Sequence, residues 1–207
     1  MATQALNVGY FIQGDVGSSA QNAHAQASGT PNNDGGAQGS AIQYFQSSGR
    51  GGGTFRYTRT FLNFDTSGIT ETSGPVKLEV PGTLHADTTV TAVKSTHATP
   101  ILATGDDFNN IDVSTPYSSA TNWSTGTNDI ILNSTAITDI RNNDDFNVAL
   151  LVTADAENTE DPLEEDGDIS CGVNFGGTIQ LVYALPLSPY IFLNSGKYSL
   201  ISGKLRI

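Results

Sequence analysis

The chain has 207 residues, enough to bury one sizeable core, and all-β sandwiches of this length commonly form one domain. Twenty-one acidic and nine basic residues give a formal net charge of -12, which repels phosphate backbones and anionic headgroups. We therefore expect neither nucleic acid nor a membrane as a partner. Cys171 is the only cysteine, which excludes an intrachain disulfide and a thiolate zinc site.

The composition also predicts the fold class. Charged residues make up only 14% of the chain, while Gly, Ser, Thr and Asn fill much of the rest. Short strands joined by many turns have this composition, whereas helical proteins carry more Ala, Leu, Glu and Lys. We expect an all-β, jelly-roll-like antiparallel β-sandwich over residues 1–185, followed by a C-terminal β-rich extension over residues 186–207.

The N-terminal quarter consists of one apolar segment followed by a long polar tract. Residues 6–12 are predicted to form the first strand. Residues 14–53 are rich in Gly, Ser, Ala, Gln and Asn, and only residues 41–45 have strand character. Because such a tract buries too little apolar surface to offset its ordering entropy, we expect an extended surface loop.

Residues 54–64 alternate aromatic and polar side chains, the period of a half-buried strand. The pattern changes phase after Phe61, which predicts a β-bulge before Leu62. Arg56 and Arg59 lie among these aromatics and are expected to contact carboxylates or carbonyls. Further strands are predicted at residues 76–80, 88–94, 128–133, 147–153 and 178–184. A short helix is predicted at residues 134–142, capped by Asn133 or Ser134.

Several of these segments carry a family resemblance. The string Arg59-Thr-Phe-Leu-Asn-Phe-Asp-Thr-Ser-Gly-Ile, followed by Val76-Lys-Leu-Glu-Val, Asn128-Asp-Ile-Ile-Leu-Asn and Gln180-Leu-Val-Tyr, resembles the DNRLRE-type family of jelly-roll domains. That family is akin to carbohydrate-binding modules and also occurs in bacteriophage virion proteins. The resemblance implies a two-sheet jelly roll and a noncatalytic role within a secreted or viral assembly. We expect no lyase or hydrolase domain beside the jelly roll in these 207 residues, and this expectation favours a particle component over a sugar-targeting module.

Two acidic segments are candidate calcium sites, because Ca²⁺ takes six to eight oxygen ligands. The candidate ligands in the first are Asp106, Asp107, Asn109 and Asp112. The alternative for this segment is a simple turn around a buried Phe108. The second segment, residues 155–168, holds eight acidic residues and is better interpreted as a solvated loop whose like charges keep it extended. No other cofactor is expected.

The sequence predicts binding rather than catalysis. It has no Gly-x-Ser-x-Gly nucleophile elbow, and the three histidines at positions 24, 85 and 97 lack metal-ligand spacing and are expected on surfaces or loops. We therefore expect no enzyme. Trp123 and Tyr117 are candidates for stacking on a sugar ring, although Trp123 is better interpreted as a partly buried strand-edge residue.

Residues 186–207 differ from the rest of the chain, because they hold Lys197, Lys204 and Arg206 and no acidic residue. Two alternatives are open: a hairpin that folds onto its own domain, or an arm that docks against another subunit. The candidate docking residues are Tyr190, Phe192, Tyr198, Leu200, Lys204 and Arg206.

Together these patterns favour a non-enzymatic structural protein of a tailed-phage-like virion, either a capsid decoration or a fibre component. We expect it in the extracellular particle, as a homo-oligomer in contact with other virion or surface proteins. The start of the chain lacks a signal-peptide pattern, and release by cell lysis would suit a virion protein. The alternative is a carbohydrate- or receptor-binding adhesion module.

Overall fold

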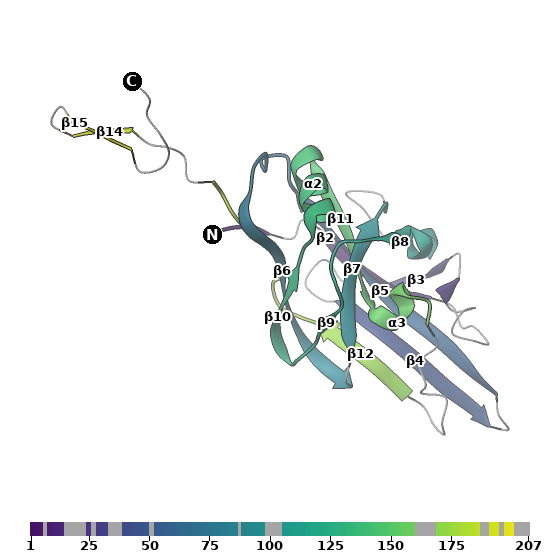
Figure 1. Cartoon of the computed structure of the whole chain (residues 1–207). Coiled ribbons are helices and arrows are strands. Elements are labelled where there is room, and N and C mark those ends of the chain that lie inside the picture. The colour runs from purple at the N-terminus through teal and green to yellow at the C-terminus, as the bar shows by residue number, and fades with distance from the viewer. Residues whose placement is uncertain are drawn as a thin grey trace.

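A computed structural model describes eleven stretches of the chain. They are residues 1–5, 8–14, 24–25, 28–32, 39–49, 52–86, 88–97, 105–159, 169–186, 191–194 and 197–200. Strands dominate these stretches and pair antiparallel throughout, so the predicted all-β sandwich class is confirmed (Figure 1).

Thirteen strands of the described chain form one sheet. They are β1 (Ala2–Ala5), β2 (Val8–Gly14), β3 (Gly29–Asn32), β4 (Gly39–Gly49), β5 (Gly52–Asp65), β6 (Ser73–Ala86), β7 (Thr89–Ser95), β8 (Ile111–Pro116), β9 (Thr121–Asn122), β10 (Gly126–Ile131), β11 (Asp145–Val152), β12 (Ile169–Phe175) and β13 (Gln180–Ala184). The main path runs β1-β13-β6-β12-β4-β5-β11-β7-β8, and β2, β3, β9 and β10 pair off it. A separate two-stranded sheet consists of β14 (Ile191–Asn194) and β15 (Lys197–Leu200).

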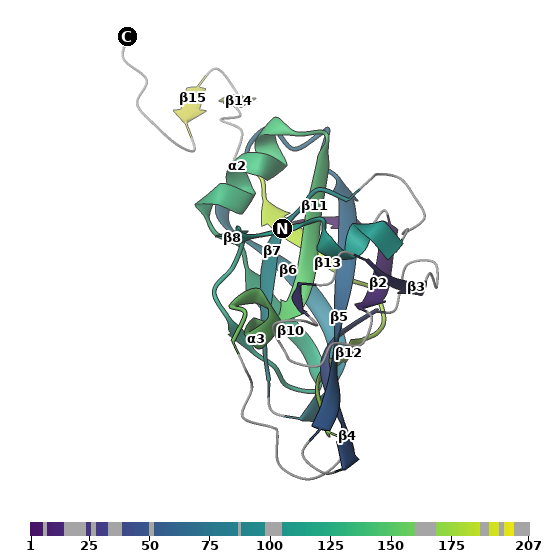
Figure 2. The same ribbon diagram turned by 90° about the vertical axis from the view of Figure 1, so that its right-hand side faces the viewer.

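The large sheet curves around a single core. One cluster of buried apolar side chains draws members from β5, β6, β7, β10, β11, β12 and β13. Figures 1 and 2 show the curvature, with helix α2 (Ser134–Asn142) at one end of the molecule and the β4–β5 hairpin at the other. The inward-pointing side chains of these strands therefore form one apolar core, and their burial stabilises the sandwich.

Strand β5 corrects one prediction. Phe61, Leu62 and Phe64 are all at most 1% exposed, and β5 pairs with β11 from Thr60 to Asp65 without any shift of register. The expected bulge is absent, because both faces of this part of β5 are covered by protein. A strand that is buried on both faces has no reason to keep a strict apolar–polar alternation.

The tract at residues 14–53 contains more strand than its composition indicated. β3 and β4 lie within it, and β4 pairs along β5 and β12 over its length. Cross-strand hydrogen bonds supply the ordering that the side chains of this tract do not predict. β8, β9 and β12 were also not predicted, whereas the strands expected near residues 76, 88, 128, 147 and 178 are present in β6, β7, β10, β11 and β13.

The predicted short helix is confirmed with its cap. α2 spans Ser134–Asn142, and the Asn133 side chain accepts a hydrogen bond from the Ala136 backbone N–H at 3.1 Å. Ala136 and Ile140 are fully buried, as a four-residue spacing on one helix face requires. Two shorter helical pieces complete the described chain: η1 (Gly105–Asn109) and α3 (Thr153–Ala156).

Neighbouring isoleucines in β10 offer a matched test of this core. Ile130 is fully buried and Ile131 is 53% exposed, because successive strand residues point to opposite faces. The Ile130→Ala variant is expected to lose about 2–5 kcal/mol of unfolding free energy, the usual cost of a large-to-small core change. Ile131→Ala is expected to change stability by only about 0.5 kcal/mol, as a surface position does. Urea denaturation of both variants measures the difference, and equal losses would contradict the assigned faces.

Candidate functional site

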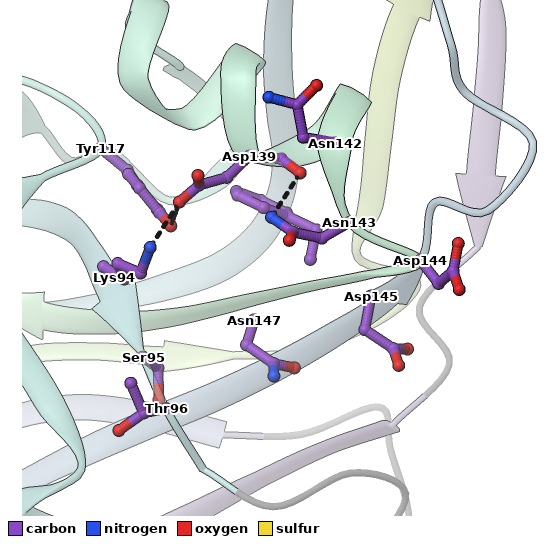
Figure 3. A pocket seen from close by; sticks show the side chains of 11 residues that line it. Lys94, Ser95, Thr96, Tyr117, Asp139, Asn142, Asn143, Asp144, Asp145 and Asn147 are labelled. Atoms are coloured by element: carbon purple, nitrogen blue, oxygen red, sulfur yellow. Dashed lines mark hydrogen bonds and ion pairs between the residues drawn. The ribbon is translucent and has the colours of Figure 1, made fainter.

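A polar groove lies beneath the C-terminal end of α2, between the end of β7 and the start of β11 (Figure 3). Its volume is about 550 Å³, within the range of small-ligand pockets. Its walls carry carboxylates, amides, hydroxyls and one ammonium. The lining residues are Lys94, Ser95, Thr96, Tyr117, Asp139, Asn142, Asn143, Asp144, Asp145, Phe146 and Asn147.

One end of the groove is a fixed charged cluster. Lys94 Nζ donates to Asp139 Oδ2 at 2.8 Å, and the Tyr117 hydroxyl donates to the same oxygen. Partial burial acts to raise the pKa of Asp139, but these two hydrogen bonds and the Lys94 charge outweigh it, so this pKa lies below its ordinary value. Burial, together with the hydrogen bond to Asp139, raises the pKa of Tyr117. Asp139 is therefore a carboxylate held in place by two donors.

The other end depends on a buried amide. Asn63 in β5 is 1% exposed, and its Nδ2 donates to Asp145 Oδ1 at 3.1 Å and to Asn147 Oδ1 at 2.8 Å. Asn63 and Asn147 face each other directly in the β5–β11 ladder, which brings these side chains within reach. Figure 3 shows Asp144 and Asp145 at this end and Lys94, Tyr117 and Asp139 at the other.

The turn between α2 and β11 is held by hydrogen bonds to its backbone carbonyls. The Asn143 side chain donates to the Asp139 carbonyl at 2.9 Å, and the Asn143 backbone N–H donates to the same carbonyl at 3.0 Å. Thr66 then donates twice, from its hydroxyl to the Asn143 carbonyl at 2.8 Å and from its backbone N–H to the Asp144 carbonyl at 2.7 Å. The loop that carries the groove's acidic residues is thus tied to β5.

The groove is electronegative. Asp139, Asp144 and Asp145 contribute three carboxylates against the single ammonium of Lys94, which Asp139 already neutralises. The C-terminal end of α2 adds partial negative charge from its last carbonyls. This arrangement favours ligands that donate hydrogen bonds or carry positive charge, and it repels anions.

Ser95 and His97 form a contact that resembles a nucleophile and base, since Ser95 Oγ lies 2.7 Å from His97 Nδ1. The Ser95 hydroxyl, however, donates to the Asn110 carbonyl at 2.8 Å, so the histidine nitrogen must donate to Ser95 Oγ. Burial lowers the pKa of His97 to about 4, against a small raising effect of Asp107. A histidine that donates toward the serine and resists protonation is arranged for structure, not for general-base catalysis.

A second polar cluster lies away from the groove. Arg59 in β5 is fully buried, and its Nε and Nη2 each bond one oxygen of Asp155 at 2.7 Å. Its Nη1 donates to the Phe108 carbonyl at 2.8 Å, and its guanidinium carbon lies 4.0 Å from the centre of the Phe108 ring. His24, with a side chain 17% exposed, places Nδ1 2.7 Å from Asp155 Oδ1. The prediction that Arg59 contacts carboxylate and carbonyl groups is confirmed.

Asp155 was expected in a solvated acidic loop, and the structure corrects this. Its side chain is fully buried at the end of β11, in α3. Burial acts to raise its pKa, but the Arg59 charge and hydrogen bonds, with His24, hold the pKa below its ordinary value. Residues 160–168 of that acidic run lie outside the described residues.

The candidate calcium ligands do not share one set of contacts. Asp107 is buried and accepts from Asn110 Nδ2 at 2.8 Å, while Asp112 accepts from the hydroxyls of Ser114 and Thr115. The hydrogen bonds from Ser114 and Thr115 lower the pKa of Asp112. Asn109 is exposed and Asp106 lies in η1. In the described part of the chain no three His, Cys, Asp or Glu side chains gather as a metal site requires.

Trp123 and Tyr117, the candidate sugar-stacking residues, are 6% and 1% exposed and belong to the core cluster. Trp123 packs edge-on against Phe175 with ring centres 5.3 Å apart, and Tyr117 stacks on Phe146 at 5.2 Å. Neither ring offers a face to solvent. Tyr117 nevertheless reaches the groove through its hydroxyl.

The other two histidines, His85 and His97, differ in burial. His85 is exposed, as expected, with Nε2 2.6 Å from Asn174 Nδ2. His97 lies in the loop after β7, as one of the two expected environments, but it is only 3% exposed and therefore buried, not on the surface. It packs edge-on against Phe61 with ring centres 5.5 Å apart. An apolar neighbour from a distant strand explains the burial, and sequence spacing gives no indication of it.

Sequence reasoning missed the groove's main residues, namely Lys94, Asp139, Asp144, Asp145 and Asn147. The run Asn142-Asn-Asp-Asp145 at a helix-to-strand junction was the available signal. Such runs are common in turns, so the signal alone does not identify a groove.

Among the candidate docking residues, Phe192 lies in β14 and Tyr198 and Leu200 lie in β15. The two strands pair so that Ile191 faces Leu200 and Leu193 faces Tyr198. Tyr190, Lys204 and Arg206 lie outside the described residues.

Comparison with protein-family models, with curated proteins and with solved structures finds no match for this chain. The resemblance to DNRLRE-type domains therefore stays a prediction. In the described residues no helix is long and apolar enough to cross a membrane.

The buried His97 makes stability depend on pH. Its pKa is about 4 in the folded protein against an ordinary value of 6.5, so between these values the unfolded chain binds a proton that the folded chain does not. The unfolding free energy is therefore expected to fall as the pH drops from 6.5 toward 4. His97→Gln should flatten this part of the profile, and the exposed control His85→Gln should leave it unchanged. Denaturation at half-unit pH steps measures it; an unchanged slope in His97→Gln would contradict the assignment.

The Arg59–Asp155 pair is expected to be costly to break. Asp155→Ala leaves an uncompensated buried guanidinium and should lose about 3–5 kcal/mol of unfolding free energy. The double variant Arg59→Met/Asp155→Leu should lose less than Asp155→Ala alone, because no charge is stranded. The matched surface control is Asp129→Ala, which breaks the exposed Lys77–Asp129 pair and should cost below about 1 kcal/mol. Chemical denaturation of the three variants measures their unfolding free energies. A double variant that is less stable than Asp155→Ala would refute the expected order.

Proposed function

We propose that the chain is a non-enzymatic structural protein of a virion-like extracellular particle, serving as a capsid decoration or a fibre component. In this role it assembles with copies of itself and with other virion or surface proteins through residues 186–207. The sandwich supplies a stable body, and the C-terminal segment supplies the attachment.

The observation that carries this proposal is the separate β14–β15 hairpin. Its strands pair only with each other among the described residues, and Figures 1 and 2 show it outside the curved sheet. A single two-stranded hairpin is at best marginally stable in water. The segment's many apolar residues therefore favour a structure completed on a neighbouring surface.

Charge supports the same role. Residues 186–207 contribute +3 to the total of -12, so residues 1–185 carry -15. A strongly negative body stays soluble and resists nonspecific association. A basic segment attached to it provides one attractive contact between otherwise repelling copies.

Adhesion to a glycan or receptor is the second candidate function, and the polar groove beneath α2 is the observation that favours it. Its carboxylates and amides suit the hydroxyl groups of a sugar. The exposed large hydrophobic side chains of the described residues are Met1, Val113, Ile131 and Leu185, and none of them is aromatic. Among the residues whose burial the structure describes, no exposed ring is present for sugar stacking, so the structural role has the stronger support.

Truncation after residue 185 tests the structural role. The shortened chain is expected to keep the β-sheet circular-dichroism spectrum and cooperative unfolding of the full chain, because among the described residues the large sheet ends at Ala184. It should be lost from purified particles and from self-association measured by analytical ultracentrifugation. Incorporation at the level of the full chain would refute attachment through residues 186–207.

A further inference from the structure

We propose that the acidic groove beneath α2 is the docking site for the basic C-terminal segment, residues 197–207, of a second copy of this chain. The proposal rests on the structural function above and names its contact surface. The occupant is a peptide of the sequence Lys-Tyr-Ser-Leu-Ile-Ser-Gly-Lys-Leu-Arg-Ile, with three cationic and no acidic side chains.

Charge complementarity is the first argument. The groove's two ends hold carboxylates: Asp139 at one, Asp144 and Asp145 at the other. Its one cation, Lys94, is already paired with Asp139 at 2.8 Å. The chain has nine cationic side chains in total. Three of them lie in the C-terminal segment, which has no acidic residue. Lysine and arginine side chains supply the donors that such carboxylates accept.

The second argument is preorganisation. Asp145 and Asn147 are held by the buried Asn63 at 3.1 and 2.8 Å, and Asp139 is held by Lys94 and Tyr117. These acceptors keep their positions before anything binds, so docking does not have to order them. Asp144 and Asn142, whose side chains make no hydrogen bond within the described residues, complete the rim and remain available to a ligand.

The third argument concerns which copy supplies the segment. Both views place β14 and β15 at the end of the molecule that holds α2, outside the curved sheet and extending away from it (Figures 1 and 2). A segment that leaves one body at its α2 end is positioned to meet the α2 end of another. Reciprocal exchange of the two segments would form a closed pair with the same contact made twice.

Charge reversal tests the contact in the full-length protein. One variant carries Asp144→Lys and Asp145→Lys in the groove, and a second carries Lys204→Glu and Arg206→Glu in the segment. Each alone is expected to lose self-association in analytical ultracentrifugation. An equimolar mixture should associate again, because each groove then meets a segment of opposite charge. A control with Glu71→Lys and Glu157→Lys, exposed carboxylates outside the groove, should associate as the unchanged chain does.

A synthetic peptide of residues 197–207 provides a second measurement. Its affinity for the chain truncated after residue 185 is expected to fall about tenfold in Asp144→Asn/Asp145→Asn, since two partly exposed ion pairs are lost. The affinity should also fall as salt rises. The control Glu71→Gln/Glu157→Gln should bind unchanged.

The outcomes separate the possible failures. Association that depends on residues 186–207 but ignores the groove variants refutes the groove and keeps the structural function. A full-length chain that stays monomeric while the peptide binds the groove of the truncated chain shows docking within one molecule and refutes exchange. The groove is assigned to adhesion instead if two results occur together. The chain binds neutral oligosaccharides on an array and the groove variants lose this binding, while the peptide binds neither the truncated chain nor its variants. A full-length chain that is monomeric at all concentrations overturns both proposals.

Discussion

One face of strand β5 organises the molecule. This face carries every second residue of the strand: Arg59, Phe61 and Asn63. Arg59 binds the Asp155 carboxylate, and the Phe61 ring packs against His97. Asn63 donates hydrogen bonds to Asp145 and Asn147. The buried guanidinium is the most demanding of these groups, because it requires fixed acceptors wherever the chain places it. The α3 carboxylate and the η1 carbonyl meet that requirement. In doing so they tie the ends of β11 and η1 to the middle of the sheet.

The groove follows from the same constraint. β11 runs antiparallel to β5, so fixing the Asp155 end of this segment also fixes Asp145 and Asn147 opposite Asp65 and Asn63. The turn that precedes β11 must then connect to α2 within a few residues, and Thr66 closes it with two hydrogen bonds. Polar side chains that sit on a rigid sheet and a pinned turn are better placed for recognition than the same groups on a free loop.

The distribution of charge bears on the proposed assembly. Residues 1–185 carry -15 and make separate copies repel one another, so the proposed association depends on a local attraction strong enough to overcome that repulsion. The basic segment and the electronegative groove provide two surfaces of opposite sign on one chain. Contacts of this kind set partner choice and rate of encounter more than total affinity, which additional apolar burial would have to supply.

Features that arise from neighbours along the chain could be predicted from the amino-acid sequence. Alternation and turn residues predicted the all-β class and seven of the strands, namely β2, β5, β6, β7, β10, β11 and β13. The Asn133 cap with apolar residues at helical spacing predicted α2. The remaining features depend on contacts between residues that are distant in the sequence. Asp155 lies 96 residues from Arg59, and Asp139 lies 45 residues from Lys94, so no local pattern could pair them. The double burial of β5, the core position of His97 and the convergence of the groove's carboxylates likewise depend on how distant strands cover one another, and a one-dimensional period carries no information about that.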